Sequence, residues 1–168
     1  MPSMAAAFET VWTDFMDFGT LLAPDAVVLD TTATSQKHVF ERAANLLASA
    51  GDVPPDTIVQ AFADRERLGT TGFGDGTAIP HGRVSGFPRL TAAVVRLAHP
   101  VEWSAVDGIP VDLVLALAGP DKAGADNLKA LALLSRTLRD RALVEKMRGV
   151  NDAGALWALL AGLAKQAA

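Results

Sequence analysis

Two apolar runs constrain the fold of this chain more than any other part of its sequence. LTAAVVRLA (90–98) and VDLVLALA (111–118) are strongly apolar, and the turn-like WSAVDG lies between them. Runs of this length and composition are typical of strands buried on both faces of a sheet. A sheet of this kind needs a layer of helices on each face, so the rest of the chain should supply those helices.

Helical patterns stand on both sides of the two predicted strands. After a short extended piece at 26–30, Thr34 or Ser35 can cap one helix, and Pro54–Pro55 can open a second. Behind the strands the pattern predicts three more helices, at 125–139, 142–148 and 152–163. The 168 residues therefore predict one α/β domain, a small sheet with helices covering both faces.

Residues 1–20 are predicted to be an N-terminal extension, and residues 21–168 the domain. Within the extension, apolar side chains recur at helical spacing: Phe8, Val11, Trp12, Phe15 and Met16. An amphipathic helix here could pack on the domain or could dock a partner. Packing is the commoner use of such a stripe.

Composition excludes several classes of protein. The chain has no cysteine, which excludes disulfides and thiolate chemistry and fits a reducing cytoplasm. A net charge of −4 argues against a nucleic-acid partner. No apolar run is long enough for direct membrane insertion, and the first residues do not resemble a secretion signal. We expect a cytoplasmic protein.

The stretch GTTGFGDGTAIPHGRV (69–84) is the strongest candidate for a functional site, because it places five glycines around His81. A histidine that accepts a phosphoryl group needs an exposed nitrogen, a fixed tautomer and donors for the phosphate oxygens. Glycines allow close approach and can present backbone N–H groups. Arg65, Arg67 and Arg83 are candidate guanidinium partners for the phosphate.

Other interpretations of this stretch are weaker. GFGDG does not match the Walker pattern, and Thr77 occupies the place of the third glycine in the dinucleotide pattern. His38 and His99 read as surface or edge residues, and no histidine spacing predicts a metal site. From spacing alone, a purely structural turn remains the alternative to a functional His81.

Asn127 is a second candidate residue. It lies one turn before Leu131, on the apolar stripe of the helix predicted at 125–139. A polar amide in that place either caps the helix or points into a polar site. The N-terminus of a helix also favours an anion. Capping is the commoner arrangement, so Asn127 supports a phosphate site without establishing one.

Three segments together resemble the type 2 enzyme IIA domains of the bacterial phosphotransferase system. They are RERLGTTGFGDGTAIPHGRV, VDGIPVDLVLALAGP and NLKALALLSRTLRD. The similarity runs from about Leu21 to the last helix and is closest to the nitrogen-regulatory members of this fructose/mannitol family. The resemblance implies an α/β sandwich around a small mixed sheet. It also implies that His81 accepts a phosphoryl group from an HPr-like carrier and that Arg65 neutralises its charge.

Further residues complete the predicted site. Phosphate contacts are expected from Asn127, Gly82 and Gly76, and partner contacts from Phe73 and Arg83. For Phe73, a plug beneath the loop is an equally good interpretation. No cofactor and no metal are expected, because phosphoryl transfer between histidines needs only positioning and electrostatics.

One departure from the family pattern leaves the function open. Many members have a second histidine where this chain has Asn127, and an amide cannot carry a positive charge or shuttle a proton. A slow, long-lived phosphohistidine would suit a regulator, which is the first hypothesis. The alternatives are a sugar-specific enzyme IIA that passes phosphate to an enzyme IIB, and an interaction module of the same fold that is not phosphorylated.

Overall fold

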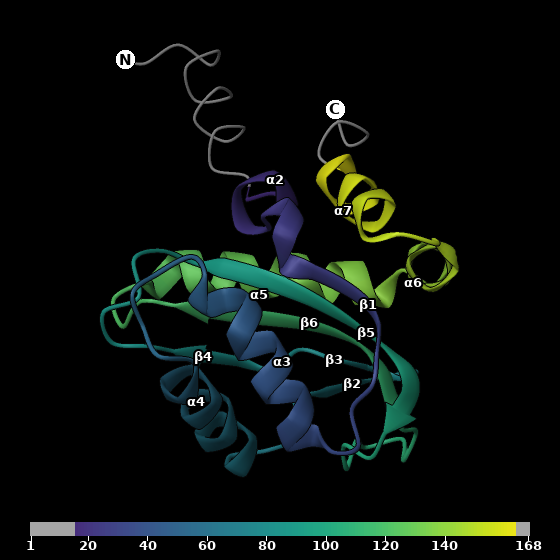
Figure 1. The fold of residues 1–168 in the computed structure, drawn as a ribbon, viewed down its shortest axis with the longest axis horizontal. Helices are drawn as coiled ribbons and strands as arrows, with labels where there is room; N and C mark the ends of the chain where they lie inside the picture. Colours follow the sequence, from purple (N-terminus) through teal and green to yellow (C-terminus); the bar gives the residue numbers. More distant parts are fainter. Residues whose placement is uncertain (1–15, 164–168) are drawn as a thin grey trace, which may run out of the picture.

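The fold is built on one mixed sheet of six strands (Figure 1). The computed structural model describes residues 16–163. Strand order is β1-β5-β6-β3-β2, and β4 also pairs with β6. The strands are β1 (Val27–Thr31), β2 (Gly72–Gly74), β3 (Thr77–Ala78), β4 (His81–Arg83), β5 (Thr91–Val101) and β6 (Val111–Gly119). The β1–β5, β3–β6 and β4–β6 pairs are parallel, whereas β5–β6 and β2–β3 are antiparallel.

The two apolar runs form the centre of this sheet, as their composition predicted. Along β6 every residue from Leu113 to Gly119 is buried, and β5 is buried from Thr91 to Val95. Their register pairs Val94 with Leu115. Aliphatic side chains point to both faces of these strands, so each face of the sheet requires its own helical layer.

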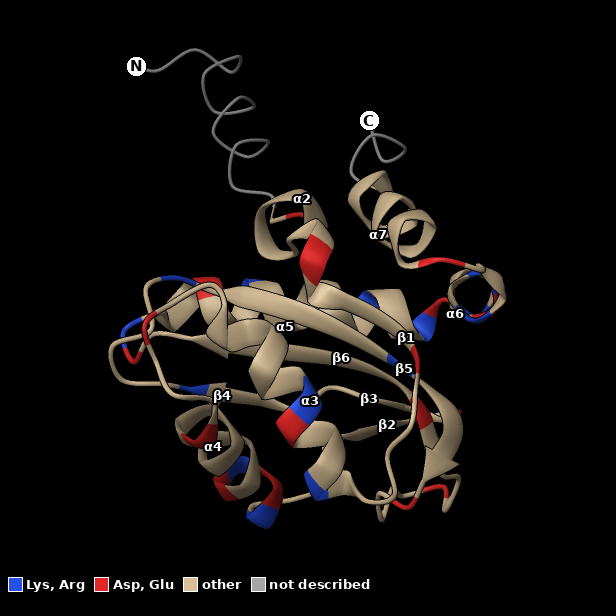
Figure 2. Cartoon of the chain, viewed as in Figure 1, with Lys and Arg blue, Asp and Glu red and all other residues tan. Residues whose placement is uncertain are grey.

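Helices form those two layers. They are α2 (Phe18–Leu21), α3 (Gln36–Ala48), α4 (Pro55–Arg67), α5 (Gly124–Arg139), α6 (Arg141–Gly149) and α7 (Ala153–Ala161), with a 3-10 turn η1 at Pro24–Ala26. Figure 1 shows α3 and α4 in front of the sheet and α5 behind it. Charged residues are concentrated on the helices and loops, while most of β5 and β6 carries none (Figure 2). The predicted α/β architecture is confirmed.

Local signals in the sequence place the helix ends. The Ser35 hydroxyl accepts a hydrogen bond from the His38 N–H at the start of α3. Pro54 and Pro55 stand at the start of α4, where a missing N–H costs nothing. Asp140 and Asp152 cap α6 and α7 by accepting from backbone N–H groups three residues later. None of the helices in residues 16–163 is long and apolar enough to cross a bilayer.

The N-terminal part of the chain is described from Met16 onward. Most of the helix predicted from Phe8 to Met16 therefore lies outside the described residues. Phe18 and Leu21 are buried in the core, so packed structure begins before the predicted boundary at residue 21.

Candidate active site at the junction of α4 and β4

His81 is the first residue of β4, at the edge of the glycine-rich segment. The structure places two short strands in this segment, β2 and β4, that the sequence does not predict. Asp75 and Gly76, with φ of 55° and 79°, form the two-residue turn between β2 and β3. His81 pairs with Leu117 of β6, and the Pro80 carbonyl accepts the Leu117 N–H. The central strand thus fixes the backbone of His81.

A backbone carbonyl sets the tautomer of the His81 ring. Nδ1 lies 2.8 Å from the carbonyl oxygen of Ile79. Since a carbonyl can only accept, Nδ1 carries the proton and donates it. The lone pair of the neutral ring is therefore on Nε2. A fixed tautomer with one available nitrogen is what a nucleophilic histidine requires.

Arg65 faces that available nitrogen. It lies in the last turn of α4, and its Nε donates to Nε2 of His81 over 3.2 Å. Its Nη1 donates to the carbonyl of Gly69 over 2.9 Å, which anchors the guanidinium beside the ring. A group that bonds to Nε2 would enter next to a fixed positive charge. This arrangement suits a phosphoryl group, whose oxygens a guanidinium can bind in a bidentate way.

The environment keeps the His81 ring neutral. Burial of the ring is the largest cause that lowers its pKa below the ordinary 6.5, and the charge of Arg65 lowers it further. The hydrogen bond to Ile79 and the charge of Glu66 act in the opposite direction but are outweighed. At neutral pH the Nε2 lone pair is therefore present.

The pH dependence of the site follows from this shift. Phosphoryl acceptance by His81 is expected to stay level through neutral pH and to decline only below 6.5, as Nε2 becomes protonated. In the same range the unfolded chain binds more protons, so His81 makes stability fall as the pH drops. Following the His81 ring protons by NMR measures the pKa directly. The midpoint should rise in Arg65→Ala, and a midpoint above 6.5 in the wild type would contradict the assignment.

A hydrogen-bond network behind the ring holds α4 to the strands. The Glu66 carboxylate accepts from both the backbone N–H and the hydroxyl of Thr71. The indole N–H of Trp103 donates to the same hydroxyl over 3.2 Å. The Thr71 carbonyl accepts the N–H of Ile79, the residue whose own carbonyl holds His81. Sequence analysis missed this network, because Trp103 stands 32 positions from Thr71 in the chain.

Gly82 has a packing role that the sequence did not reveal. A Cβ built at Gly82 would lie 2.8 Å from the Cβ of Ala61 and 3.2 Å from its backbone carbon. Helix α4 thus passes directly over β4, and no side chain separates them. This close approach places Arg65 within reach of His81. Whether the Gly82 N–H contacts phosphate, as expected from the glycine-rich sequence, stays a prediction.

Gly82→Ala is expected to destabilise the protein by about 1–3 kcal/mol, because the added methyl group must push α4 away from β4. Urea unfolding measures the change. Gly149→Ala is the matched control, since a Cβ there meets nothing within 4 Å. It should leave stability unchanged or raise it slightly. Equal stability of Gly82→Ala and the wild type would contradict the close approach.

The remaining predicted residues are not all gathered at His81. Gly76 lies in the β2–β3 turn, where a Cβ would meet a guanidinium nitrogen of Arg148 at 2.8 Å. Its carbonyl accepts from the N–H groups of Asp112 and Leu113, at the start of β6, whereas His81 pairs with Leu117 further along. The structure therefore gives Gly76 a turn role, away from the His81 ring.

Asn127 is half-buried at the end of the first turn of α5, on the same side as the buried Ala130 and Leu134. Among the described residues, no hydrogen bond joins its side chain to His81 or Arg65. No side-chain hydrogen bond caps α5, so Asn127 does not serve as a helix cap.

The two predicted partner-binding residues are both accessible. Phe73 is 37% exposed in the edge strand β2, so it is not a plug beneath the loop. Arg83 is exposed at the end of β4, beside a shallow groove that also includes Asp64 and Ser85. Whether either contacts a partner stays a prediction. No group of three or more His, Asp or Glu side chains that could hold a metal occurs within residues 16–163.

Comparison with known protein families shows which family the chain belongs to. The family described as "Phosphoenolpyruvate-dependent sugar phosphotransferase system, EIIA 2" matches residues 20–162. The chain belongs to this type 2 enzyme IIA family. The resemblance inferred from the sequence is thereby confirmed.

Within the type 2 enzyme IIA family, the chain is similar to the nitrogen regulatory protein of Bradyrhizobium diazoefficiens. The two are 38% identical over 141 residues, which is 84% of this chain and 92% of the relative. The crystal structure of nitrogen regulatory protein IIA-Ntr from Neisseria meningitidis has a TM-score of 0.81 at 34% identity, covering 85% of this chain and 98% of that one.

A more distant neighbour supports the fold alone. It is the Escherichia coli complex of enzyme IIA mannitol with phosphorylated enzyme IIB mannitol. The TM-score is 0.71 at 22% identity, over 84% of this chain and 99% of that one.

Proposed function

We propose that this type 2 enzyme IIA protein is a histidine phosphocarrier with a regulatory role. The observation that carries the proposal is the geometry of His81. Its Nδ1 is bonded to the Ile79 carbonyl, and its Nε2 faces the guanidinium of Arg65. A neutral imidazole with one available lone pair, beside a fixed positive charge, is arranged for attack on phosphorus.

The transfer would proceed in one exchange of bonds. Nε2 of His81 gives up its hydrogen bond from Arg65 Nε and forms a bond to the phosphorus of a phosphohistidine on an HPr-like carrier, while the P–N bond of the carrier breaks. The carrier's imidazole leaves with the electron pair of that bond. Arg65 would neutralise the phosphoryl oxygens, and the Ile79 carbonyl would keep its hydrogen bond to the Nδ1 proton of the phosphorylated ring. The Gly82 N–H and Asn127 would supply further donors.

Relatives favour regulation over sugar transport. Nitrogen regulatory proteins from Bradyrhizobium diazoefficiens and Pseudomonas aeruginosa are each 38% identical to this chain. A sugar-specific role, in which phosphate passes on to an enzyme IIB, is the second candidate. It is favoured by the 30% identity to the fructose-specific EIIA component of Haloferax volcanii. In either role the protein would act in the cytoplasm, and Phe73 and Arg83 would contact its partners.

A reconstituted phosphoryl relay tests the proposal. Phosphoenolpyruvate, enzyme I and an HPr-like carrier are incubated with the protein, and its intact mass is followed with time. We expect a gain of one phosphoryl group that acid removes, as from a phosphohistidine. Transfer onward to a purified enzyme IIB would indicate the sugar-specific role. No gain, with a carrier that phosphorylates another enzyme IIA, would leave only an interaction module.

Asn127→His is expected to accelerate the relay, because a histidine can carry a charge or a proton that the amide cannot. The time course of the mass gain gives the two rate constants under identical conditions. Asn127→Gln is the matched control, since it keeps the amide, and it should not be faster than the wild type. A histidine variant no faster than the wild type would show that residue 127 does not limit transfer.

A further inference from the structure

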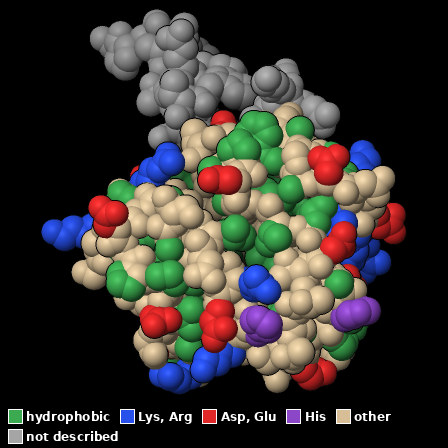
Figure 3. Space-filling model, in the orientation of Figure 1, with side chains coloured by type: hydrophobic (Ala, Val, Ile, Leu, Met, Phe, Trp, Pro, Cys, Tyr) green, Lys and Arg blue, Asp and Glu red, His purple; other side chains and the backbone are tan. Residues whose placement is uncertain are grey.

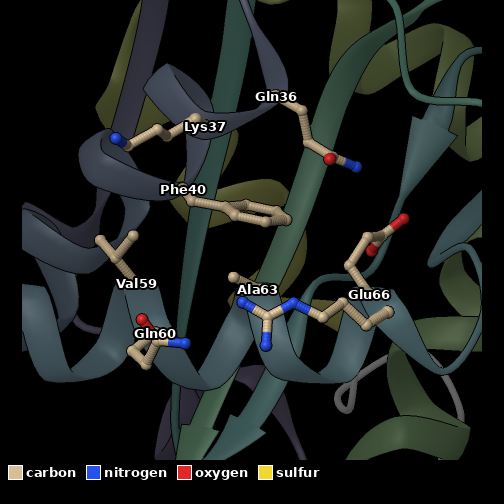
Figure 4. A pocket seen from close by; sticks show the side chains of 8 residues that line it. Gln36, Lys37, Phe40, Val59, Gln60, Ala63 and Glu66 are labelled. Atoms are coloured by element: carbon tan, nitrogen blue, oxygen red, sulfur yellow. The ribbon is translucent and has the colours of Figure 1, made fainter.

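A groove between α3 and α4 has the features of a small-molecule site separate from His81. It has a volume of about 440 Å³, within the range of ligand pockets. We call it the α3–α4 groove. Gln36, Lys37 and Phe40 line it from α3, and Gln60, Glu66 and Arg67 line it from α4. Figure 4 shows the Phe40 ring across the middle of the groove, with Gln36 and Lys37 on one side and Gln60 on the other.

The floor of the groove is apolar and closely packed. Phe40 is 3% exposed, and its ring lies 5.6 Å from the rings of both Phe62 and Trp103, edge-on to the latter. Val59 and Ala63 add aliphatic surface beside it. Because Phe40 is buried, Val59 and Ala63 supply the accessible apolar surface on which a flat or aliphatic body could lie. Figure 3 shows this face of the molecule, where hydrophobic side chains over α3 and α4 lie between acidic and basic ones.

The charges around the groove favour an anion. Lys37 and Arg67 contribute two positive charges, and Glu66 is the one acidic residue of the lining. Both Glu66 oxygens already accept hydrogen bonds from Thr71, which leaves this carboxylate committed to the protein. Arg67 Nη1 pairs with Asp64 at 2.7 Å, but a guanidinium has five N–H donors and can bind a second acceptor. Gln36 supplies an amide donor at the side, and the Gln60 amide, which donates to Asp64 over 2.8 Å, has a second N–H.

We propose that the α3–α4 groove binds a small carboxylate with an apolar body. The body would lie on Val59 and Ala63, over the buried Phe40 ring, and the carboxylate would bind between Lys37 and Arg67. Hydrogen bonds from a guanidinium and an ammonium to a carboxylate are stronger than those between neutral groups. A monoanion of modest size fits this site, because Asp64 already offsets part of the charge of Arg67 and the groove volume is about 440 Å³.

The groove is connected to the His81 site through a short series of contacts. Phe40 packs edge-on against Trp103, whose indole N–H donates to the Thr71 hydroxyl. Thr71 bonds Glu66, a residue of the groove wall, and also Ile79, which holds Nδ1 of His81. A ligand that shifts Phe40 or Glu66 changes the support of the ring. This regulatory consequence rests on the proposed function, whereas binding to the groove does not.

Binding is tested on the unphosphorylated full chain by amide and indole NMR spectra during titration with benzoate. We expect shifts at Lys37, Gln60 and Arg67 and at the Trp103 indole N–H. Benzamide, which has the same shape without the charge, should bind about tenfold more weakly. The double variant Lys37→Gln/Arg67→Gln should lose affinity for benzoate about tenfold or more, while Arg136→Gln/Lys146→Gln, on α5 and α6, should bind like the wild type.

Three results would overturn the site: no shifts at millimolar benzoate, equal affinity for benzamide, or equal affinity of inorganic phosphate, which would indicate only a nonspecific pair of cations.

The coupling is tested by the relay rate with and without benzoate, using Lys37→Gln/Arg67→Gln as control. A rate that benzoate changes in the wild type and not in this variant supports the coupling; an unchanged rate overturns it. A protein that binds benzoate but gains no phosphate would retain the site and lose the proposed function.

Discussion

The His81→Ala variant is expected to gain no phosphate in the relay, under conditions in which the wild type gains one group per chain. The variant lacks Nε2, the one nitrogen that the structure places beside Arg65 with an available lone pair. The loss should be complete, because the transfer needs a nucleophile and a water molecule in its place would produce only free phosphate. Intact-mass spectrometry measures the result.

The other two histidines provide matched controls. His38 lies in the first turn of α3 and His99 in the exposed part of β5, so His38→Ala and His99→Ala should gain phosphate like the wild type. Because His81 is half-buried, the folded state of His81→Ala must be verified by its unfolding transition. Phosphate on a folded His81→Ala protein would place the acceptor elsewhere and remove the basis of the proposal.

Arg65→Ala is expected to slow phosphoryl acceptance about 100- to 1000-fold, the usual cost of removing one donor aimed at developing charge. The guanidinium does two things in this structure: it donates to Nε2 and it bonds the Gly69 carbonyl. The reaction is quenched at successive times with saturating phosphorylated carrier, and the intact mass at each time gives the rate. Arg65→Lys should recover part of it, since the charge remains but the planar fork is lost.

Arg67→Ala separates the effect of Arg65 from a general loss of positive charge. Arg67 lies two residues later on α4 and pairs with Asp64 at the surface, at 2.7 Å. Its removal changes the net charge equally, yet the rate should change by less than about threefold, because it does not face the ring. Similar losses in the two variants would mean that the arginines act by attracting the carrier and not at the phosphoryl group.

Much of the fold was predictable, because strands buried between two layers of helices must be apolar on both faces, and such runs are visible in the sequence. The runs at 90–98 and 111–118 are apolar on both faces, and this by itself indicates central strands. Strands β2 and β4 were not predictable in the same way. They are three residues each, rich in glycine, and they exist because neighbouring strands supply their hydrogen bonds. Tertiary pairing overrides weak local preference in such segments.

Only part of the candidate site was predictable from the sequence. Arg65 and His81 could be named because motif spacing pointed to them, and the structure brings them together. The roles of Thr71 and Trp103 could not be inferred, since 32 positions separate two residues that share a hydrogen bond. Gly76 was grouped with His81 by proximity in sequence, but the β2–β3 turn directs the chain away from the ring.

The single hydrogen bond from Nδ1 to Ile79 has a consequence for regiochemistry. An imidazole has two nitrogens that can carry phosphorus, and in solution both positional isomers form. Here the backbone occupies one of them, so only one isomer can be made without first breaking that bond. Every protein that reads the phosphorylated state would then meet the phosphate on the same edge of the ring. A partner surface that recognises the phosphorylated protein would need to fit only this one positional isomer.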